Sequence, residues 1–186
     1  MRFLQFVTRW TVLLAFIPVW FGMLMLSMLR IQASGTTRYV NPDGLCSQQL
    51  PCSTTIMNAI NNSANGDTII LQANITEGDL NKNTSLANLT IEGYSATTLV
   101  TLNGGMNWPV VNNWTFQNMK IASNLAILSA PTGVTINNIT FTYSTGGQIG
   151  IGSTTASIGG TITITNNTFF GSSGGISIIG GDGSAG

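Results

Sequence analysis

The chain has 186 residues, of which only 6% are charged, and its formal net charge at pH 7 is zero. So few Lys and Arg argue against a nucleic-acid partner, because such partners require basic side chains that neutralise phosphates. The sequence has no His, so the commonest general base and metal ligand are missing. Apolar positions recur regularly through an Asn-, Thr-, Ser- and Gly-rich chain, which predicts turn-dense β structure rather than disorder.

Residues 1–33 are predicted to be a targeting segment. Arg2 and Arg9 precede residues 10–29, an apolar stretch without charge that ends at Arg30. This pattern fits a cleaved signal peptide, with Ala33 before the cut, and equally a retained anchor that contacts the membrane through residues 10–29. Both alternatives place the rest of the chain outside the cytoplasm, secreted or at the cell surface.

Residues 34–65 are predicted to lead into the main domain. Cys46 and Cys52 are the only cysteines, and in an exported chain a closely spaced pair predicts a disulfide. The alternative, a metal or redox pair, lacks further ligands. We therefore expect neither a metal nor a cofactor.

A short amphipathic helix is expected next. Thr54 or Thr55 can cap its start, and Gly66 can end it in a left-handed conformation. Its apolar face would consist of Ile56, Ala59, Ile60 and Ala64. A strand over residues 68–71 should follow the turn.

A six-residue pattern then recurs four times within residues 66–186. It reads apolar, any, Asn, any, Thr, Ile or Phe, and its Asn positions are separated by 25, 25 and 28 residues. Such a period predicts a stacked solenoid. We expect the Asn residues to take left-handed corners and to form one ladder between coils, namely Asn88, Asn113, Asn138 and Asn166. We expect the last residue of each copy to stack in one core row, namely Ile91, Phe116, Phe141 and Phe169.

The run Thr-Ile-x-x-Ala-Ile-x-x-x-Ala-x-Gly-Asp-Thr-Ile-x-Leu at residues 55–71 resembles the N-terminal start of the pectin-lyase-like family. Tyr39-Val40 and Pro51-Cys52 look like the same region of many exported bacterial members. With the repeat, the resemblance covers residues 39 to about 180. It implies an all-β fold, a right-handed parallel β-helix with a short N-terminal capping α-helix. An antiparallel sandwich is the alternative that the register of the repeat disfavours.

The repeat asparagines also read as N-glycosylation acceptors, as do Asn61, Asn74 and Asn83. We expect the ladder asparagines to be buried at an edge and closed to a transferase. Asn74 and Asn83 lie in loop-like sequence and should be better acceptors.

No catalytic constellation is visible. The resemblance implies that active relatives use clustered acids with calcium and a base, or carboxylate pairs. Residues 110–170 contain no acid and only Lys120 as a base. We interpret Glu77, Asp79 and Lys82 as a solvated loop, and Asp67 as part of the turn after the helix.

Two features point to binding instead. Trp108 and Trp114 are candidates for an aromatic platform under a sugar ring, with packing as the equal alternative. Threonines that alternate outward on one strand can form a flat face of the kind found in ice-binding solenoids, namely Thr161, Thr163 and Thr165, together with Thr135.

The leading hypothesis is an exported β-helix for adhesion or for binding carbohydrate or another cell-surface ligand. The alternative is a polysaccharide lyase or glycoside hydrolase with its active site beyond Gly186, and ice binding is a weaker one. Because no cap follows the strand-like residues 176–179, we expect the sequence to be the N-terminal portion of a longer protein.

Overall fold

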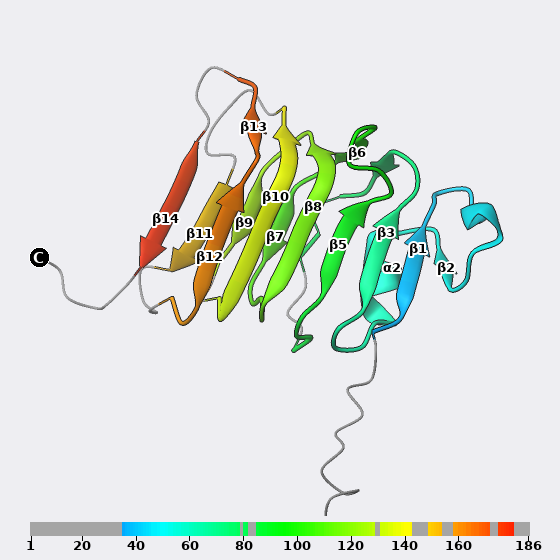
Figure 1. Ribbon diagram of the computed structural model, residues 1–186, viewed down its shortest axis with the longest axis horizontal. Coiled ribbons are helices and arrows are strands. Elements are labelled where there is room, and N and C mark those ends of the chain that lie inside the picture. The colour runs from blue at the N-terminus through cyan, green and yellow to red at the C-terminus, as the bar shows by residue number, and fades with distance from the viewer. Residues whose placement is uncertain are drawn as a thin grey trace, which may run out of the picture. The chain divides into compact units, whose positions relative to one another are not determined.

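Every strand pairing among the described residues is parallel, so the strands within each sheet run side by side in one direction (Figure 1). The computed structural model describes residues 35–78, 80–81, 85–128, 131–142, 149–153, 158–171 and 175–180. In these ranges the chain winds into a parallel β-helix of about four turns, which confirms the predicted all-β solenoid. The predicted signal or anchor segment, residues 1–33, lies outside the described residues. Within the described ranges no helix is long and apolar enough to cross a membrane.

Two parallel sheets form the walls of the solenoid. Sheet A has the strand order β12-β10-β8-β5-β3-β1-β2, with β4, β6 and β13 paired beside this path, and sheet B has the order β14-β11-β9-β7. The strands of sheet A are β1 (Thr37–Val40), β2 (Cys52–Ser53), β3 (Thr68–Leu71), β4 (Ile75–Thr76), β5 (Thr90–Gly93), β6 (Val100–Asn103), β8 (Trp114–Ile121), β10 (Gly133–Phe141), β12 (Thr161–Thr165) and β13 (Thr168–Phe169). Those of sheet B are β7 (Met106–Trp108), β9 (Leu125–Ile127), β11 (Ile149–Ser153) and β14 (Ile176–Gly180).

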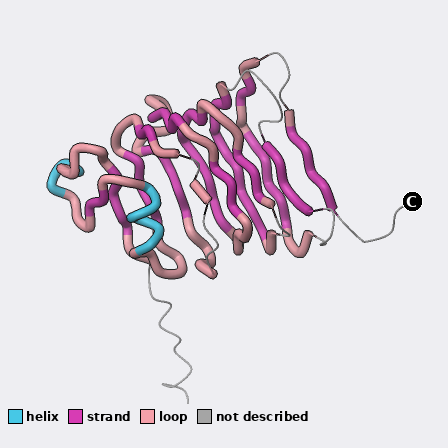
Figure 2. Tube along the Cα trace, turned by 180° about the vertical axis from the view of Figure 1, so that it is seen from behind, coloured by secondary structure: helices cyan, strands magenta, loops and turns pink. Residues whose placement is uncertain are grey.

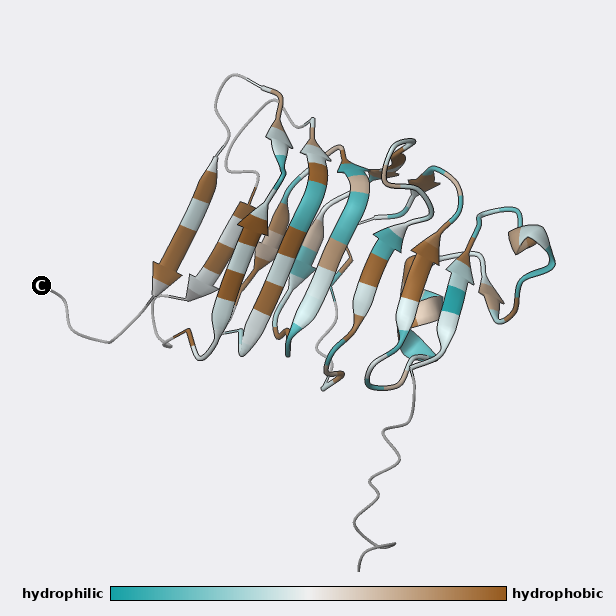
Figure 3. Ribbon diagram, viewed as in Figure 1, coloured by the Kyte–Doolittle hydropathy of each residue, from teal (hydrophilic) through white to brown (hydrophobic). Residues whose placement is uncertain are grey.

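Apolar and polar residues alternate along most strands of sheet A, as Figure 3 shows for β12. Successive strand residues point to opposite faces, so every second residue enters the core. Pairing in register stacks these inward residues into columns between coils. One column of sheet A consists of Ile69, Ile91, Phe116, Ile136 and Ile164. The apolar positions of the repeat therefore form the hydrophobic core, as the period predicted.

The prediction of a single core row through Ile91, Phe116, Phe141 and Phe169 is nevertheless wrong. Phe116 pairs with Ile136, whereas Phe141 pairs with Ile121 on one side and Phe169 on the other. Phe141 and Phe169 stack with ring centroids 5.2 Å apart and an interplanar angle of 6°. The expected row thus divides into two columns, one on each side of a bend in sheet A.

A difference in coil length explains why the predicted row divides. The coil between Asn118 and Asn138 has 20 residues, whereas the coil between Asn88 and Asn113 has 25. The repeat copy at residues 136–141 therefore aligns with residues 116–121 of β8 and not with residues 111–116. Residues 116–121 carry Asn118 but lack the Thr of the pattern, so the sequence search missed this copy.

Asparagines form the corners in two columns. Asn88 and Asn113 make the first, where the Asn113 amide donates to Asn88 Oδ1 at 2.7 Å. Asn118 and Asn138 belong to the second, and the Asn138 amide donates to Asn118 Oδ1 at 2.9 Å. In the next coil of this column, Asn166 donates to Asn137 Oδ1 at 2.9 Å. The prediction of one continuous ladder through Asn88, Asn113, Asn138 and Asn166 is thus wrong.

All five corner asparagines have left-handed backbones, with φ of 57° at Asn88, Asn113 and Asn166, 58° at Asn118 and 50° at Asn138. Asn tolerates this region better than most residues. Their side chains are not buried, since three are exposed and those of Asn118 and Asn138 are half-buried. The expectation of a buried edge was therefore wrong, although amide hydrogen bonds still hold these side chains.

We expect Asn118→Ala to lower the free energy of unfolding by about 1 to 2 kcal/mol, because Ala is strained at positive φ. Asn118→Gly should lower it less, since Gly accepts this conformation and only the ladder hydrogen bond is lost. Urea denaturation measures both, with Asn103→Ala on the exposed end of β6 as control. Equal losses for the Ala and Gly variants would contradict a backbone cause.

Helix α2 (Ile56–Asn61) packs at the N-terminal end of the solenoid (Figure 2). Thr55 Oγ1 accepts a hydrogen bond from Asn58 N at 3.1 Å, and Ile56, Ala59 and Ile60 are buried, as predicted. Ala64 lies beyond the helix and is exposed, so its predicted place on the apolar face is wrong. The helix and its buried face close one end of the core.

Asp67 holds this end of the chain together and is only 2% exposed. Its carboxylate accepts hydrogen bonds from Thr36 N at 2.8 Å, Arg38 Nε at 2.7 Å and Ala64 N at 2.9 Å. Burial raises the pKa of Asp67, but the hydrogen bonds from Ala64, Arg38 and Thr36 outweigh it and hold the pKa below its ordinary value. The ionised carboxylate therefore stabilises the junction between β1 and β3.

Asp67→Asn should destabilise the protein by about 3 kcal/mol at neutral pH, because it breaks a buried ion pair. The folded pKa of Asp67 lies below the unfolded value of about 3.9, so its stabilisation is present above that value and is lost as pH falls through the folded pKa. Urea denaturation at pH 7 and about pH 2 should show the gap between variant and wild type closing in acid. A gap that stays constant with pH would contradict this role.

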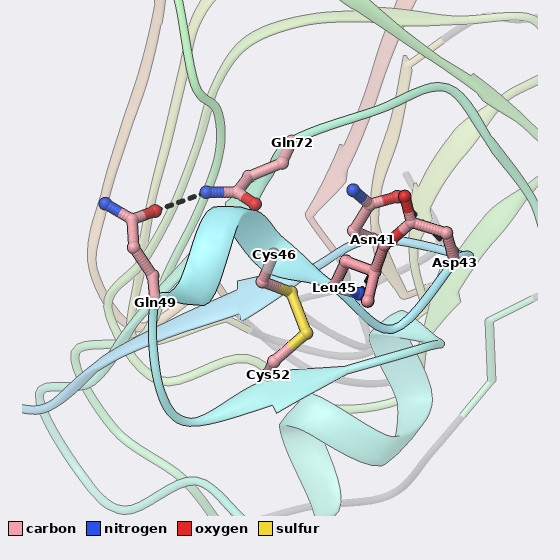
Figure 4. The surroundings of a disulfide bond; sticks show 7 residues. All are labelled: Asn41, Asp43, Leu45, Cys46, Gln49, Cys52 and Gln72. Atoms are coloured by element: carbon pink, nitrogen blue, oxygen red, sulfur yellow. Dashed lines mark hydrogen bonds between the residues drawn. A yellow bond between two sulfur atoms is a disulfide. The ribbon is translucent and has the colours of Figure 1, made fainter.

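The predicted disulfide joins Cys46 and Cys52, with an S–S distance of 2.05 Å and a Cα–Cα distance of 5.8 Å (Figure 4). Cys46 belongs to the short 3₁₀ helix η1 (Cys46–Gln48), and Cys52 begins β2. Gln72, just after β3, donates to Gln49 beside the disulfide. The cross-linked loop thus attaches to the first coil.

The last described strand leaves apolar side chains exposed. Ile176 and Ile178 pair with the buried Ile149 and Ile151, yet they are 47% and 51% exposed. No described strand pairs with the second edge of β14. The inward columns of sheet B therefore end at solvent among the described residues.

Candidate ligand-binding face

The two tryptophans do not form a platform for a sugar. Trp108 is 0% exposed and Trp114 is 1% exposed, and their rings pack with centroids 5.2 Å apart. Trp114 Nε1 donates to Leu86 O at 2.9 Å, while Trp108 Nε1 is buried without a partner among the described residues. Their candidacy as ligand contacts is therefore wrong, and both pack in the core, as the alternative expectation had it.

This difference between the tryptophans is testable. Trp114→Phe should lower the free energy of unfolding by about 1 kcal/mol more than Trp108→Phe, because only Trp114 loses a made hydrogen bond while both lose similar volume. Denaturant unfolding of the two variants measures it. A larger loss of unfolding free energy for Trp108→Phe would contradict the assignment of the hydrogen bond to Trp114.

The acidic side chains of the described residues have structural partners. Glu77 accepts hydrogen bonds from Ile56 N at 2.7 Å and Met57 N at 3.1 Å, so it satisfies the first amides of helix α2. It is half-buried, and the expectation of a solvated loop was wrong for this residue. Asp79 and Lys82, its suggested companions, lie outside the described residues. In the described ranges no three His, Cys, Asp or Glu side chains gather where a metal could bind.

The outer surface of sheet A carries the most regular chemistry in the molecule. Register places one threonine from each of six strands in a single line across the sheet, which we call the threonine column. It consists of Thr37, Thr68, Thr90, Thr115, Thr135 and Thr163. Thr115, Thr135 and Thr163 each lie between two apolar residues of their strand. Thr37, Thr68 and Thr90 are the first residues of their strands, and pairing places them in the line. Sequence reasoning found only the members at the last two strands, because coil lengths differ and hide the line.

A second outward line, two residues further along each strand, flanks the threonine column. This polar column consists of Tyr39, Ile70, Glu92, Gln117, Asn137 and Thr165. Its members bond to each other, since Gln117 Nε2 donates to Glu92 Oε2 at 2.5 Å and Thr165 Oγ1 donates to Asn137 Oδ1 at 3.1 Å. Glu92 is the only charged residue of the two columns. Together they make a nearly uncharged, hydrogen-bonding face.

The hydroxyl groups of the threonine column are available to a ligand. None has a hydrogen-bond partner among the described residues, although their side chains are half-buried against neighbouring coils. Neighbouring strands lie about 4.8 Å apart, so six strands space these hydroxyls over about 24 Å. Thr is β-branched and stiff at χ1, so the array is largely preorganised.

The outer surface of sheet B is different. Its outward column consists of Asn107, Ala126, Gly150 and Ser177, and the last three, which are small, border a shallow groove of about 160 Å³. Exposed Leu128 and Ile179 are also part of the groove lining. This groove has few polar groups, so the two sheets offer chemically distinct surfaces.

Two of the predicted glycosylation acceptors are on the surface. Asn74 is exposed, but its Oδ1 accepts a hydrogen bond from Thr101 N at 2.8 Å, and Asn61 is exposed at the end of α2. Asn83 lies outside the described residues. Whether any of them is modified stays a prediction.

No protein-family model, curated protein or solved structure matches this chain. The likeness to the pectin-lyase-like family remains a resemblance of sequence pattern.

Proposed function

We propose that this protein is an exported binding protein that holds carbohydrate of a cell surface on the outer face of sheet A. The observation that carries the proposal is the pair of aligned columns, which present hydroxyl, amide and carboxylate groups in fixed register over six strands. Sugars offer hydroxyls that both donate and accept, so such a face suits them. The basic and apolar N-terminal pattern of the sequence supports export.

The near-neutral character of the face supports a sugar over a charged partner. Among twelve side chains in the two columns, only Glu92 has a charge, and Gln117 already bonds to it. Affinity for phosphate or a polyanion would need Lys or Arg at this surface. A preorganised array also lowers the entropy lost on binding, which favours a ligand with many weak contacts.

Ice binding is a second candidate, favoured by the length of the threonine column. A repeated line of hydroxyl and methyl groups can order water, and six strands contribute to it rather than the single strand seen in sequence. Against it, the neighbouring column mixes Tyr39, Ile70 and Glu92 with amides, so the face is not uniform. Thermal hysteresis measurements distinguish this candidate from sugar binding.

A glycan array probed with the full chain tests the leading proposal. We expect binding to neutral glycans, weakened at least about fivefold by Gln117→Ala or Asn137→Ala, since each removes about one hydrogen-bonding group. Ser177→Ala on the outer face of sheet B is the matched control and should bind as wild type. Depolymerisation of a polysaccharide without stable binding would overturn the proposal in favour of an enzyme.

A further inference from the structure

We infer that the threonine column holds a neutral polysaccharide strand that runs along the solenoid axis, with about one sugar unit for each coil. This inference rests on the proposed function and specifies the ligand and its direction. It differs from sugar binding at an isolated pocket, because every coil would contribute the same contact.

The direction follows from the symmetry of the face. Along the axis, the same side chain recurs in six neighbouring strands. Along each strand, the threonine is followed by only one further outward residue, which belongs to the polar column. Sheet A then bends at the corner that contains Asn118 and Asn138. A polymer of identical units can repeat its contacts only along the axis. The rise of a coil, about 4.8 Å, is close to the length of one sugar ring.

The chemistry follows from which groups are unpaired. In the polar column, Glu92, Gln117 and Asn137 already bond within the protein. In the threonine column, no hydroxyl has a partner among the described residues. A bound chain would therefore find its free donors and acceptors in the threonine column, with the polar column as one flank.

The absence of charge in the threonine column specifies the class of polysaccharide. Thr side chains offer a hydroxyl and a methyl group, which match the hydroxyls and the C–H surface of a neutral sugar. Charged glycans gain nothing from this column, so binding should change little with ionic strength. A uronic-acid polymer would need basic side chains beside the column, and its described members include none.

The geometry also sets a length for the ligand. The column spans about 24 Å, so each added sugar unit should strengthen binding until about six units are bound. Longer chains should show no further gain per binding site. A pocket for one sugar would instead show a plateau at one or two units.

The test uses the full chain in a polyoxyethylene detergent and linear neutral oligosaccharides of two to eight units, with glucan, xylan and mannan series. Calorimetry should show affinity rising to about six units. Thr115→Val, at the centre of the column, should weaken binding of the hexamer roughly 5- to 10-fold, and Thr115→Ser should retain most of it because the hydroxyl is kept.

Thr140→Val is the matched control. Thr140 lies on β10 beyond the corner Asn138, pairs with Lys120 and Thr168, and is outside the threonine column. We expect this variant to bind as wild type. Circular dichroism and thermal unfolding should show that both Val variants remain folded, since Val is well accepted in strands.

The outcomes separate the two proposals. Binding without length dependence, unchanged by Thr115→Val, overturns the inference and leaves sugar binding on the outer face standing. Failure to bind any of the three series or the glycan array overturns the proposed function as well. If the protein binds no sugar but shows thermal hysteresis, and Thr115→Val abolishes that hysteresis, both proposals are overturned. The threonine column would then be an ice-binding surface.

Discussion

The structure depends on parallel backbone pairing between successive coils. A single coil of this chain has too few apolar residues to form a core, and its inward Ile, Leu and Phe side chains become buried only when neighbouring coils stack on them. The inward side chains can therefore be buried only where the strands of neighbouring coils pair in register. At the N-terminal end, α2, Asp67 and the Cys46–Cys52 loop supply the contacts that a preceding coil would make.

The corners decide how freely coil length can vary. Each Asn corner needs a left-handed backbone and a polar side chain that bonds to the adjacent coil, but nothing fixes the number of residues between corners. Coils of 20 and 25 residues consequently stack without loss of register. Space is also restricted there, since a Cβ on Gly93 would lie 2.0 Å from Asn118 O. Length changes are absorbed in loops, and the strands stay aligned.

The same pairing that builds the core also builds the outer face. Inward residues must be apolar for burial, whereas outward residues are free to vary, and here they repeat as threonine over six strands. Thr is favoured in strands, which accounts for single occurrences. A complete column of hydroxyls that have no hydrogen-bond partner among the described residues is a surface with a fixed repeat, and this repeat is the reason for proposing an extended ligand rather than a compact one.

The sequence by itself determined the fold class, the position of α2, the strand at residues 68–71, the disulfide and the left-handed asparagines, because these depend on local patterns. Tertiary structure decided which residues share a column. A local motif cannot report that the coil ending at Asn138 is five residues shorter than the one ending at Asn113, so Phe116 and Phe141 separated into two rows and Asn118 went unnoticed. Burial of Trp108 and Trp114, and the threonine column itself, likewise exist only when coils stack in register.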